Sequence, residues 1–293
     1  MSNTTVTMNA ASMNNSGFEF SATYRNRDHD FKYEVSANLS TLRNRVTSLG
    51  FGTDSYISGS YITKVGEEIG QFYGWVYEGI ARTQEVLDNH ATQEGAQIGD
   101  CLYKDVNNDG KVDSEDQVVL GSGMPKINFG LNARFEYKRF DLSIATFGAL
   151  NYHVSDDIYN SLNSCYGWGN KEVGMLDANR FSEDGSTYLS NVPRTYVTNS
   201  ASLGWNDLFS SRKIQNAAYW KIANVELGYN FPDKWFDKYV SDVRFYISAQ
   251  NLHTFTGYHG YNVDYAGGTF TPGYNFCSYP TARTFMCGVH FTF

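Results

Sequence analysis

Strict alternation of apolar and polar residues is the dominant pattern along this chain. Between Phe31 and Ser40 every second residue is apolar and each residue between them is polar. Successive side chains of a strand point to opposite faces, so this pattern predicts strands with one apolar and one polar face. It recurs in seven segments, which begin near residues 17, 30, 126, 140, 217, 242 and 280.

The segment near residue 217 carries one exception to the pattern. Tyr219, Ala223, Val225 and Leu227 are expected to share the apolar face of this strand, interrupted only by Lys221.

The lengths of these segments and of their connections favour a membrane barrel. Each segment has about 10 to 14 residues, which matches a tilted membrane strand. Long connections on one side and short turns on the other are typical of outer-membrane barrels. The sequence therefore predicts an all-β fold, an antiparallel transmembrane β-barrel segment with long extracellular loops. Its short connections are 26–30, 138–139 and 232–241, and its long ones are about 49–125, 151–215 and 253–279.

The number of strands indicates that the barrel wall is larger than this chain. Seven strands with long loops outside begin outside the cell and end in the periplasm, whereas bacterial single-chain barrels have even strand numbers. The first 20 residues also lack a basic region followed by an apolar one, as a signal peptide would have. We therefore expect residues 1–293 to be the C-terminal part of a larger barrel.

Composition excludes several other classes of protein. The chain has 22 Tyr, 20 Phe and 5 Trp, a sum of 47 aromatic residues or 16%, beside 27 Gly and only 5 Pro, which favours strands. The formal charge of 23 − 31 = −8 argues against sequence-independent nucleic-acid binding. With a mean hydropathy of −0.44 and no apolar run near about 18 residues, helical membrane spans are excluded.

The candidate chemistry does not point to an enzyme. No catalytic triad, phosphate-binding loop or pair of catalytic carboxylates stands out in the sequence. Cys101, Cys165, Cys277 and Cys287 lack the spacing of a zinc site, and both pairing into disulfides and remaining unpaired stay open.

One motif resembles a calcium loop. Calcium prefers several oxygen ligands, and alternate positions of a tightly turning loop provide them. Residues 84–120 hold nine acidic and two basic residues, a local charge of −7. A structural calcium ion in this extracellular loop is therefore expected, and a turn held by side-chain to backbone hydrogen bonds is the alternative. The candidate ligands within 105–116 are Asp105, Asn107, Asp109, the carbonyl of Lys111, Asp113 and Asp116, the last in place of the usual Glu.

Aromatic residues in the long connections are candidate ligand-binding groups, because rigid aromatic side chains often anchor interfaces. Packing within the loops and a girdle at the membrane interface are the alternatives. The candidates are Tyr166, Trp168, Trp205, Tyr258 and Tyr261.

Several short motifs, in the same order along nearly the whole chain, resemble the SusC/RagA family of TonB-dependent outer-membrane transporters. Each motif alone is weak, but their collinear order is specific. The motifs are residues 17–20, 38–50, 72–80, Gly99-Asp100 leading to 105–113, 137–143, 227–232, 248–256 and 279–285.

This resemblance implies a plugged barrel of about 22 strands in the outer membrane. It implies import of oligosaccharides or peptides, a SusD-like surface lipoprotein that covers the barrel mouth, and TonB as the source of energy. The sequence shows no plug domain and no N-terminal segment for TonB, so we expect no transport by the chain alone.

Two other classes remain as alternatives. A soluble calcium-dependent carbohydrate-binding β-domain would pack its apolar faces against one another and would need no detergent. A small autonomous barrel enzyme or adhesin would need an even number of strands.

Overall fold

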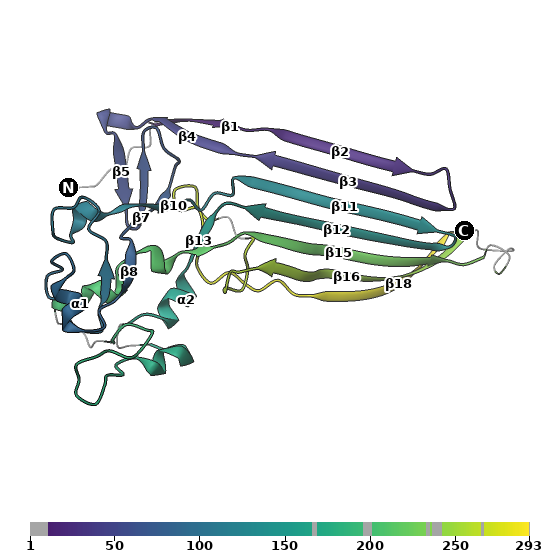
Figure 1. Ribbon diagram of the computed structural model, residues 1–293. Helices are drawn as coiled ribbons and strands as arrows, with labels where there is room; N and C mark the ends of the chain where they lie inside the picture. Colours follow the sequence, from purple (N-terminus) through teal and green to yellow (C-terminus); the bar gives the residue numbers. More distant parts are fainter. Residues whose placement is uncertain are drawn as a thin grey trace, which may run out of the picture.

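A single seven-stranded antiparallel sheet dominates the molecule (Figure 1). The computed structural model describes residues 11–165, 169–195, 201–232, 235, 242–264 and 267–292. The seven strands lie side by side in the order in which they follow one another along the chain. This arrangement confirms the all-β antiparallel fold expected from the alternation. In spatial order the strands are β18 (Thr284–Thr292), β16 (Asp242–Thr256), β15 (Tyr219–Asn230), β12 (Phe140–Leu150), β11 (Ile127–Tyr137), β3 (Phe31–Thr41) and β2 (Glu19–Asn26).

The two faces of this sheet differ in chemistry. Residues directly opposite one another in neighbouring strands share a face, and Leu142, Leu227, Ile247 and Cys287 form one such row. We call this side the apolar face. Its large side chains are exposed: Phe20 is 64% exposed, Leu227 41% and Ile247 48%. The opposite side, the polar face, carries ion pairs.

A bulge in β15 changes the face on which its first residues lie. The register of β15 against β16 shifts between Ile222 and Asn224, and that against β12 shifts at the same level. An extra residue inverts the alternation, so Trp220 and Ile222 lie on the apolar face while Tyr219 and Lys221 turn to the polar face. The prediction for Tyr219 was therefore wrong, and Lys221 does not interrupt the apolar face.

The first strand also differs from its prediction. It is divided into β1 (Ser12–Ser16) and β2, and β1 pairs with β4 (Arg43–Ser48) beyond the end of the seven-stranded sheet. Between β1 and β2 the chain passes so close to the end of β3 that only glycine fits at position 17. A Cβ on Gly17 would lie 1.9 Å from the carbonyl oxygen of Thr41. The Phe18 amide donates to Thr41 Oγ1 at 2.9 Å.

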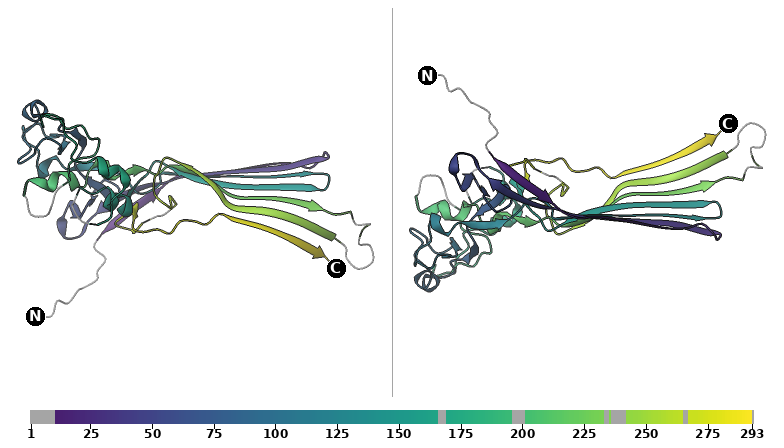
Figure 2. Two further views of the ribbon diagram at one scale, coloured as in Figure 1. Left: turned by 90° about the horizontal axis from the view of Figure 1, so that it is seen from below. Right: turned by 90° about the horizontal axis from the view of Figure 1, so that it is seen from above.

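The long connections gather at one end of the sheet and form a folded body, which we call the loop region (Figure 1). Figure 2 shows the seven-stranded sheet as one curved layer with the loop region at one end. Fully buried apolar side chains such as Phe72, Tyr103 and Val154 lie in the loop region, so the hydrophobic core sits there.

The described residues of the loop region form three small sheets besides the β1–β4 pair. The first is ordered β10 (Val118–Gly121), β7 (Gln71–Gly74), β6 (Tyr61–Lys64) and β5 (Ser55–Ser58). The second pairs β8 (Tyr77–Ile80) with β9 (Cys101–Tyr103), and the third places β13 (His153–Asp156) between β14 (Gln215–Asn216) and β17 (Tyr274–Asn275).

The helices of the described residues are short and belong to the loop region. The α-helices are α1 (Gln84–Asp88) and α2 (Asp157–Leu162). The 3₁₀ helices are Gly50–Gly52, Ser114–Asp116, Val173–Asp177, Ala201–Asp207 and Ser211–Lys213. Throughout the described part of the chain, no helix has both the length and the apolar character needed to span a membrane.

Candidate functional site

An ion-pair cluster on the polar face joins three strands of the large sheet. Arg244 of β16 lies between Asp141 of β12 and Glu226 of β15, with N–O distances of 2.5 and 2.8 Å. Gly228 makes room for this guanidinium, since a Cβ there would lie 2.4 Å from Arg244 Nη2. The cluster satisfies charges on a face whose counterpart in a barrel is the interior.

A second pair of opposite charges lies where the sheet meets the loop region. Lys221 Nζ is 2.9 Å from Asp264 Oδ2, and the lysine side chain is 6% exposed. The β15 bulge places this lysine on the polar face, beside Tyr219 and the buried cluster to which Tyr219 belongs. The ion pair thereby fixes the 253–279 connection to the wall.

A buried carboxylate connects the two longest connections of the loop region. Asp100 is fully buried and accepts from Arg194 Nε at 2.5 Å and from Arg194 Nη2 at 3.0 Å. It also accepts from Asn206 Nδ2 at 2.8 Å and from the Gln97 amide at 2.9 Å. We call these four residues the Asp100 hub. Four donors on one carboxylate compensate the cost of burying its charge.

The candidate calcium loop is closed by its own hydrogen bonds. Asp105 accepts from the amides of Asp109 at 3.3 Å and Gly110 at 2.8 Å, and Asn107 Oδ1 accepts from the Asp109 amide at 3.0 Å. Asp109 Oδ1 accepts in turn from the Lys111 amide at 2.9 Å. These contacts are those of an Asn/Asp-rich turn.

Asp116, expected as the last calcium ligand, is fully buried. Its carboxylate accepts from the amides of Val106 at 2.7 Å, Asn107 at 3.3 Å and Asp113 at 2.9 Å. Burial alone would raise the pKa of Asp116, but the three amide donors outweigh it and hold the pKa below 3.8. Asp113 caps the adjoining 3₁₀ helix by accepting from the Glu115 amide.

Within the described ranges, no group of three or more His, Cys, Asp or Glu side chains lies close enough together to hold a metal ion. In this conformation the side-chain oxygens of the loop accept hydrogen bonds from backbone amides. The calcium site therefore stays a prediction from the sequence.

Two tryptophans line a cleft of about 650 Å³ in the loop region, which we call the tryptophan cleft. Trp75 follows β7 and Trp205 lies in the 3₁₀ helix Ala201–Asp207. Trp205 was a sequence candidate for ligand contact, whereas Trp75 was not selected, although it lies inside the family-like motif 72–80. The other lining residues are Glu94, Gly95, Asp113, Ser114, Gly204 and Leu208.

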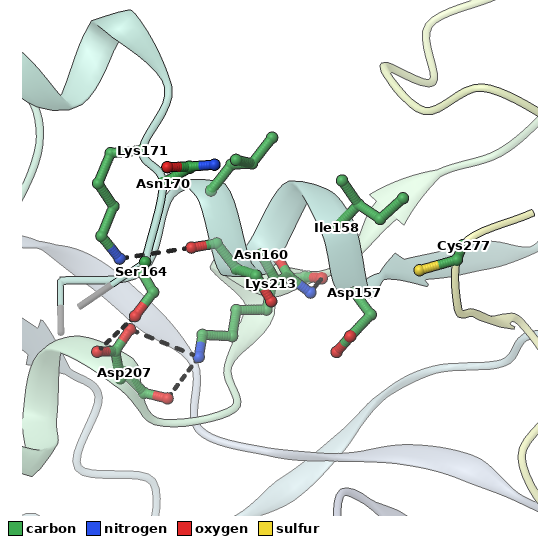
Figure 3. Close-up of a pocket in the computed structure, with 12 residues that line it drawn as sticks. Asp157, Ile158, Asn160, Ser164, Asn170, Lys171, Asp207, Lys213 and Cys277 are labelled. Carbon is green, nitrogen blue, oxygen red and sulfur yellow. Dashed lines mark hydrogen bonds and ion pairs between the residues drawn. The ribbon is translucent and has the colours of Figure 1, made fainter.

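A second cavity, of about 710 Å³, lies beside α2 (Figure 3). Its charged side chains bind the protein itself: Lys213 Nζ donates to the Asp207 carbonyl at 2.5 Å, and Ser164 Oγ donates to Asp207 Oδ2 at 3.1 Å. Burial lowers the pKa of Lys213. Lys171 Nζ reaches the Ser161 carbonyl at 3.5 Å. These contacts give Lys213, Ser164 and Lys171 a role in the folding of the loop region.

The remaining aromatic candidates lie in different environments. Tyr258 is 6% exposed; its hydroxyl donates to Asp156 and accepts from Asn275 Nδ2 at 2.8 Å, which favours a structural role. Tyr261 is exposed and lines a small cavity near Lys221. Tyr166 and Trp168 lie outside the described residues.

Comparison with known proteins finds that this chain is similar to TonB-dependent receptors. No family model matches the sequence. TonB-dependent receptor P3 of Formosa agariphila is 29% identical over 97% of this chain, and TonB-dependent receptor SusC of Bacteroides thetaiotaomicron is 25% identical over 99% of it. The chain spans 29% and 27% of the lengths of these relatives.

Solved structures agree with this comparison at the level of the fold. A structure of the RagAB peptide transporter superposes with a TM-score of 0.77 at 20% identity, covering 97% of this chain and 29% of the other. The RagAB peptide importer in its open-open state gives a TM-score of 0.72 at 21% identity. The resemblance found in the sequence motifs is thus confirmed: this chain is similar, over nearly its whole length, to less than a third of a SusC/RagA-type TonB-dependent transporter.

Proposed function

We propose that this chain forms part of the wall and the extracellular loops of a TonB-dependent importer in the outer membrane. The observation that carries this proposal is the large sheet, with one exposed apolar face, one ion-paired polar face and a folded loop region at one end. Lipid would cover the apolar face, and the polar face would line the barrel interior. The role is transport, not catalysis.

The edges of the large sheet support this assignment. Among the residues that the structure describes, β2 and β18 are the end strands of the sheet, and each pairs there with one neighbour. In hydrocarbon every unpaired backbone group costs several kcal/mol, so spanning sheets close into barrels. Both edges would therefore pair with further wall strands, in a barrel of about 22 strands as in the plugged transporters.

The similarity to SusC and RagAB supports a proposal for the partners and substrates. A SusD-like lipoprotein would cover the loop region from outside, and TonB would supply energy through a plug region. The cargo would be an oligosaccharide or a peptide.

The soluble carbohydrate-binding β-domain is a weaker alternative. Such a domain would bury its apolar sheet face, yet Phe20, Phe140 and Ile247 on that face are all exposed. An exposed apolar patch of this extent marks a membrane or protein interface.

Calcium binding by loop 105–116 is a separate proposal, because the hydrogen bonds of the turn account for the loop by themselves. Bound calcium would brace the loop region and would play no part in a reaction. Addition of calcium should raise the midpoint of thermal unfolding, and Asp105→Asn should abolish that increase. An unchanged midpoint in the unmodified protein would end the proposal.

Gene deletion in the native bacterium tests the proposed function. The chain should fractionate with the outer membrane and require detergent for extraction. Deletion should abolish uptake of one class of fluorescently labelled oligosaccharide or peptide, and the restored gene should recover it. Extraction by salt alone, or undiminished uptake of both classes, would refute the proposal.

A further inference from the structure

The tryptophan cleft has the features of a ligand subsite rather than of a packing defect. Its volume of about 650 Å³ lies within the range of small-molecule sites, roughly 300–1,000 Å³. Its walls come from the distant segments 75, 94–95, 113–114 and 204–208. The cleft therefore exists only because the two longest connections of the loop region fold against each other.

The two indole rings are held in place by their own N–H groups. Trp75 Nε1 donates to the Asp113 carbonyl, and Trp205 Nε1 donates to the Glu94 carbonyl, both at 2.9 Å. With these donors occupied, each indole offers a ligand its apolar ring surface. A fixed ring loses little conformational entropy when a ligand binds, which favours affinity.

Packing beneath the rings reinforces this rigidity. Trp75 and Trp205 both pack against the buried cluster of Cys101, Tyr103 and Val112. The ring centroids of Tyr103 and Trp205 are 6.2 Å apart, and the Tyr103 hydroxyl donates to the Trp205 carbonyl. The buried cluster therefore supports both tryptophan rings of the cleft.

Polar groups stand at the rim of the cleft. The Glu94 and Ser114 residues are exposed and line it, while Asp113 Oδ1 is occupied by the Glu115 amide. A rim with an exposed carboxylate and a hydroxyl beside apolar ring faces matches a ligand that has apolar faces and hydroxyl edges. A sugar ring has this combination.

We propose that the tryptophan cleft binds a neutral saccharide, with sugar rings against Trp75 and Trp205 and sugar hydroxyls hydrogen-bonded to Glu94 and Ser114. The inference rests on the proposed function and narrows its cargo to glycans. The charge of −7 over residues 84–120 disfavours anionic glycans. A cationic peptide is less well matched, because its partners would be the two exposed carboxylates that line the cleft, Glu94 and Asp113, and exposed ion pairs are weak.

Binding measurements on the detergent-solubilised full chain test this inference. The probes are an array of neutral oligosaccharides and a tetralysine peptide, and the best glycan is then titrated by calorimetry. Trp75→Ala and Trp205→Ala should each weaken glycan binding about tenfold, the energy of one aromatic contact. Trp235→Ala is the matched control, because Trp235 is exposed and contacts Phe231 outside the cleft.

A second measurement avoids variants that fail to fold. In the unmodified protein, the bound oligosaccharide should protect Trp75 and Trp205, but not Trp235, from oxidation by N-bromosuccinimide. The oxidised residues are identified by mass spectrometry. Glu94→Gln should weaken glycan binding and leave thermal unfolding unchanged, since the carboxylate is exposed.

Three outcomes would overturn the cleft inference: no neutral glycan binds, a bound glycan leaves both cleft tryptophans unprotected, or tetralysine protects them instead. Loss of oligosaccharide uptake on gene deletion together with any of these results would refute the cleft inference and leave the proposed importer standing. Undiminished uptake of both classes, together with protection of the cleft tryptophans by a glycan, would refute the proposed importer and leave the cleft inference standing.

Discussion

Removal of the Asp100 carboxylate should destabilise the loop region and leave the stability of the large sheet unchanged. Asp100→Ala deprives the Arg194 guanidinium, whose side chain is 17% exposed, of its counter-ion. It also removes the acceptor of the Asn206 amide and of the Gln97 backbone N–H. Breaking a buried ion pair by removing one partner costs about 3–5 kcal/mol. We expect a loss of local stability of that size.

Hydrogen exchange of the membrane-reconstituted protein measures this loss. Amides of β8, β9 and the 3₁₀ helix Ala201–Asp207 should lose protection equivalent to about 3–5 kcal/mol, whereas amides of the large sheet should keep theirs. The double variant Asp100→Ala/Arg194→Leu should recover part of the loss, because it leaves no unpaired buried charge.

The matched control breaks an exposed ion pair of the same loop region. Asp177 Oδ1 is 2.8 Å from Arg180 Nη1, and both side chains are exposed. Asp177→Ala should cost at most about 1 kcal/mol. If Asp100→Ala cost no more than this control, or if protection were lost equally in the large sheet, the reasoning from burial would be wrong.

Three further outcomes follow from the described contacts. Asp264→Ala should lower stability by about 1.5–3 kcal/mol, because it leaves the Lys221 ammonium buried without its charged acceptor, and Lys221→Met should be better tolerated in thermal unfolding. Asp116→Ala should cost about 1–3 kcal/mol, because it leaves buried backbone donors unsatisfied. The pKa of Asp116 is lowered in the folded state, so the stability that this carboxylate contributes is present above pH 3.8 and is lost as the pH falls through the lowered pKa. Denaturant unfolding at several pH values measures this loss. A membrane-impermeant maleimide should label the exposed Cys277 on intact cells but not Cys101, because Cys101 is buried and its burial raises the pKa of the thiol to about 11. Labelling of Cys101, mapped by mass spectrometry, would contradict its burial.

Part of the candidate site could be predicted from residue type and part could not. The sequence selected Trp205 as a candidate for ligand contact, and it lines the tryptophan cleft. It also selected Tyr258, which is buried against Asp156. Both are aromatic residues in long connections, and nothing local distinguishes a ring that faces a cleft from one that packs inside. Trp75 could have been found only through its position inside a family-like motif.

The strand that starts at Tyr219 shows a similar limit. Its alternation is regular from Val225 onward, and there the predicted apolar face is correct. Before that point the bulge inverts the faces, and the sequence marks this only by Lys221 among apolar residues. A bulge depends on how two neighbouring strands are paired, so one strand's sequence does not reveal it.

Alternation with a period of two is a local property, so the seven strands, their order along the chain and most of their two faces could be predicted from the residues alone. The contacts between distant loop residues became known only from the folded chain. Asp100 and Arg194 are 94 residues apart, and Trp75 and Trp205 come from different connections. Such contacts depend on the closure and packing of long loops, which leave no periodic signal in the sequence. The local pattern of residues therefore predicts the strands of the wall, whereas the Asp100 hub and the tryptophan cleft arise from the folding of the loop region as a whole.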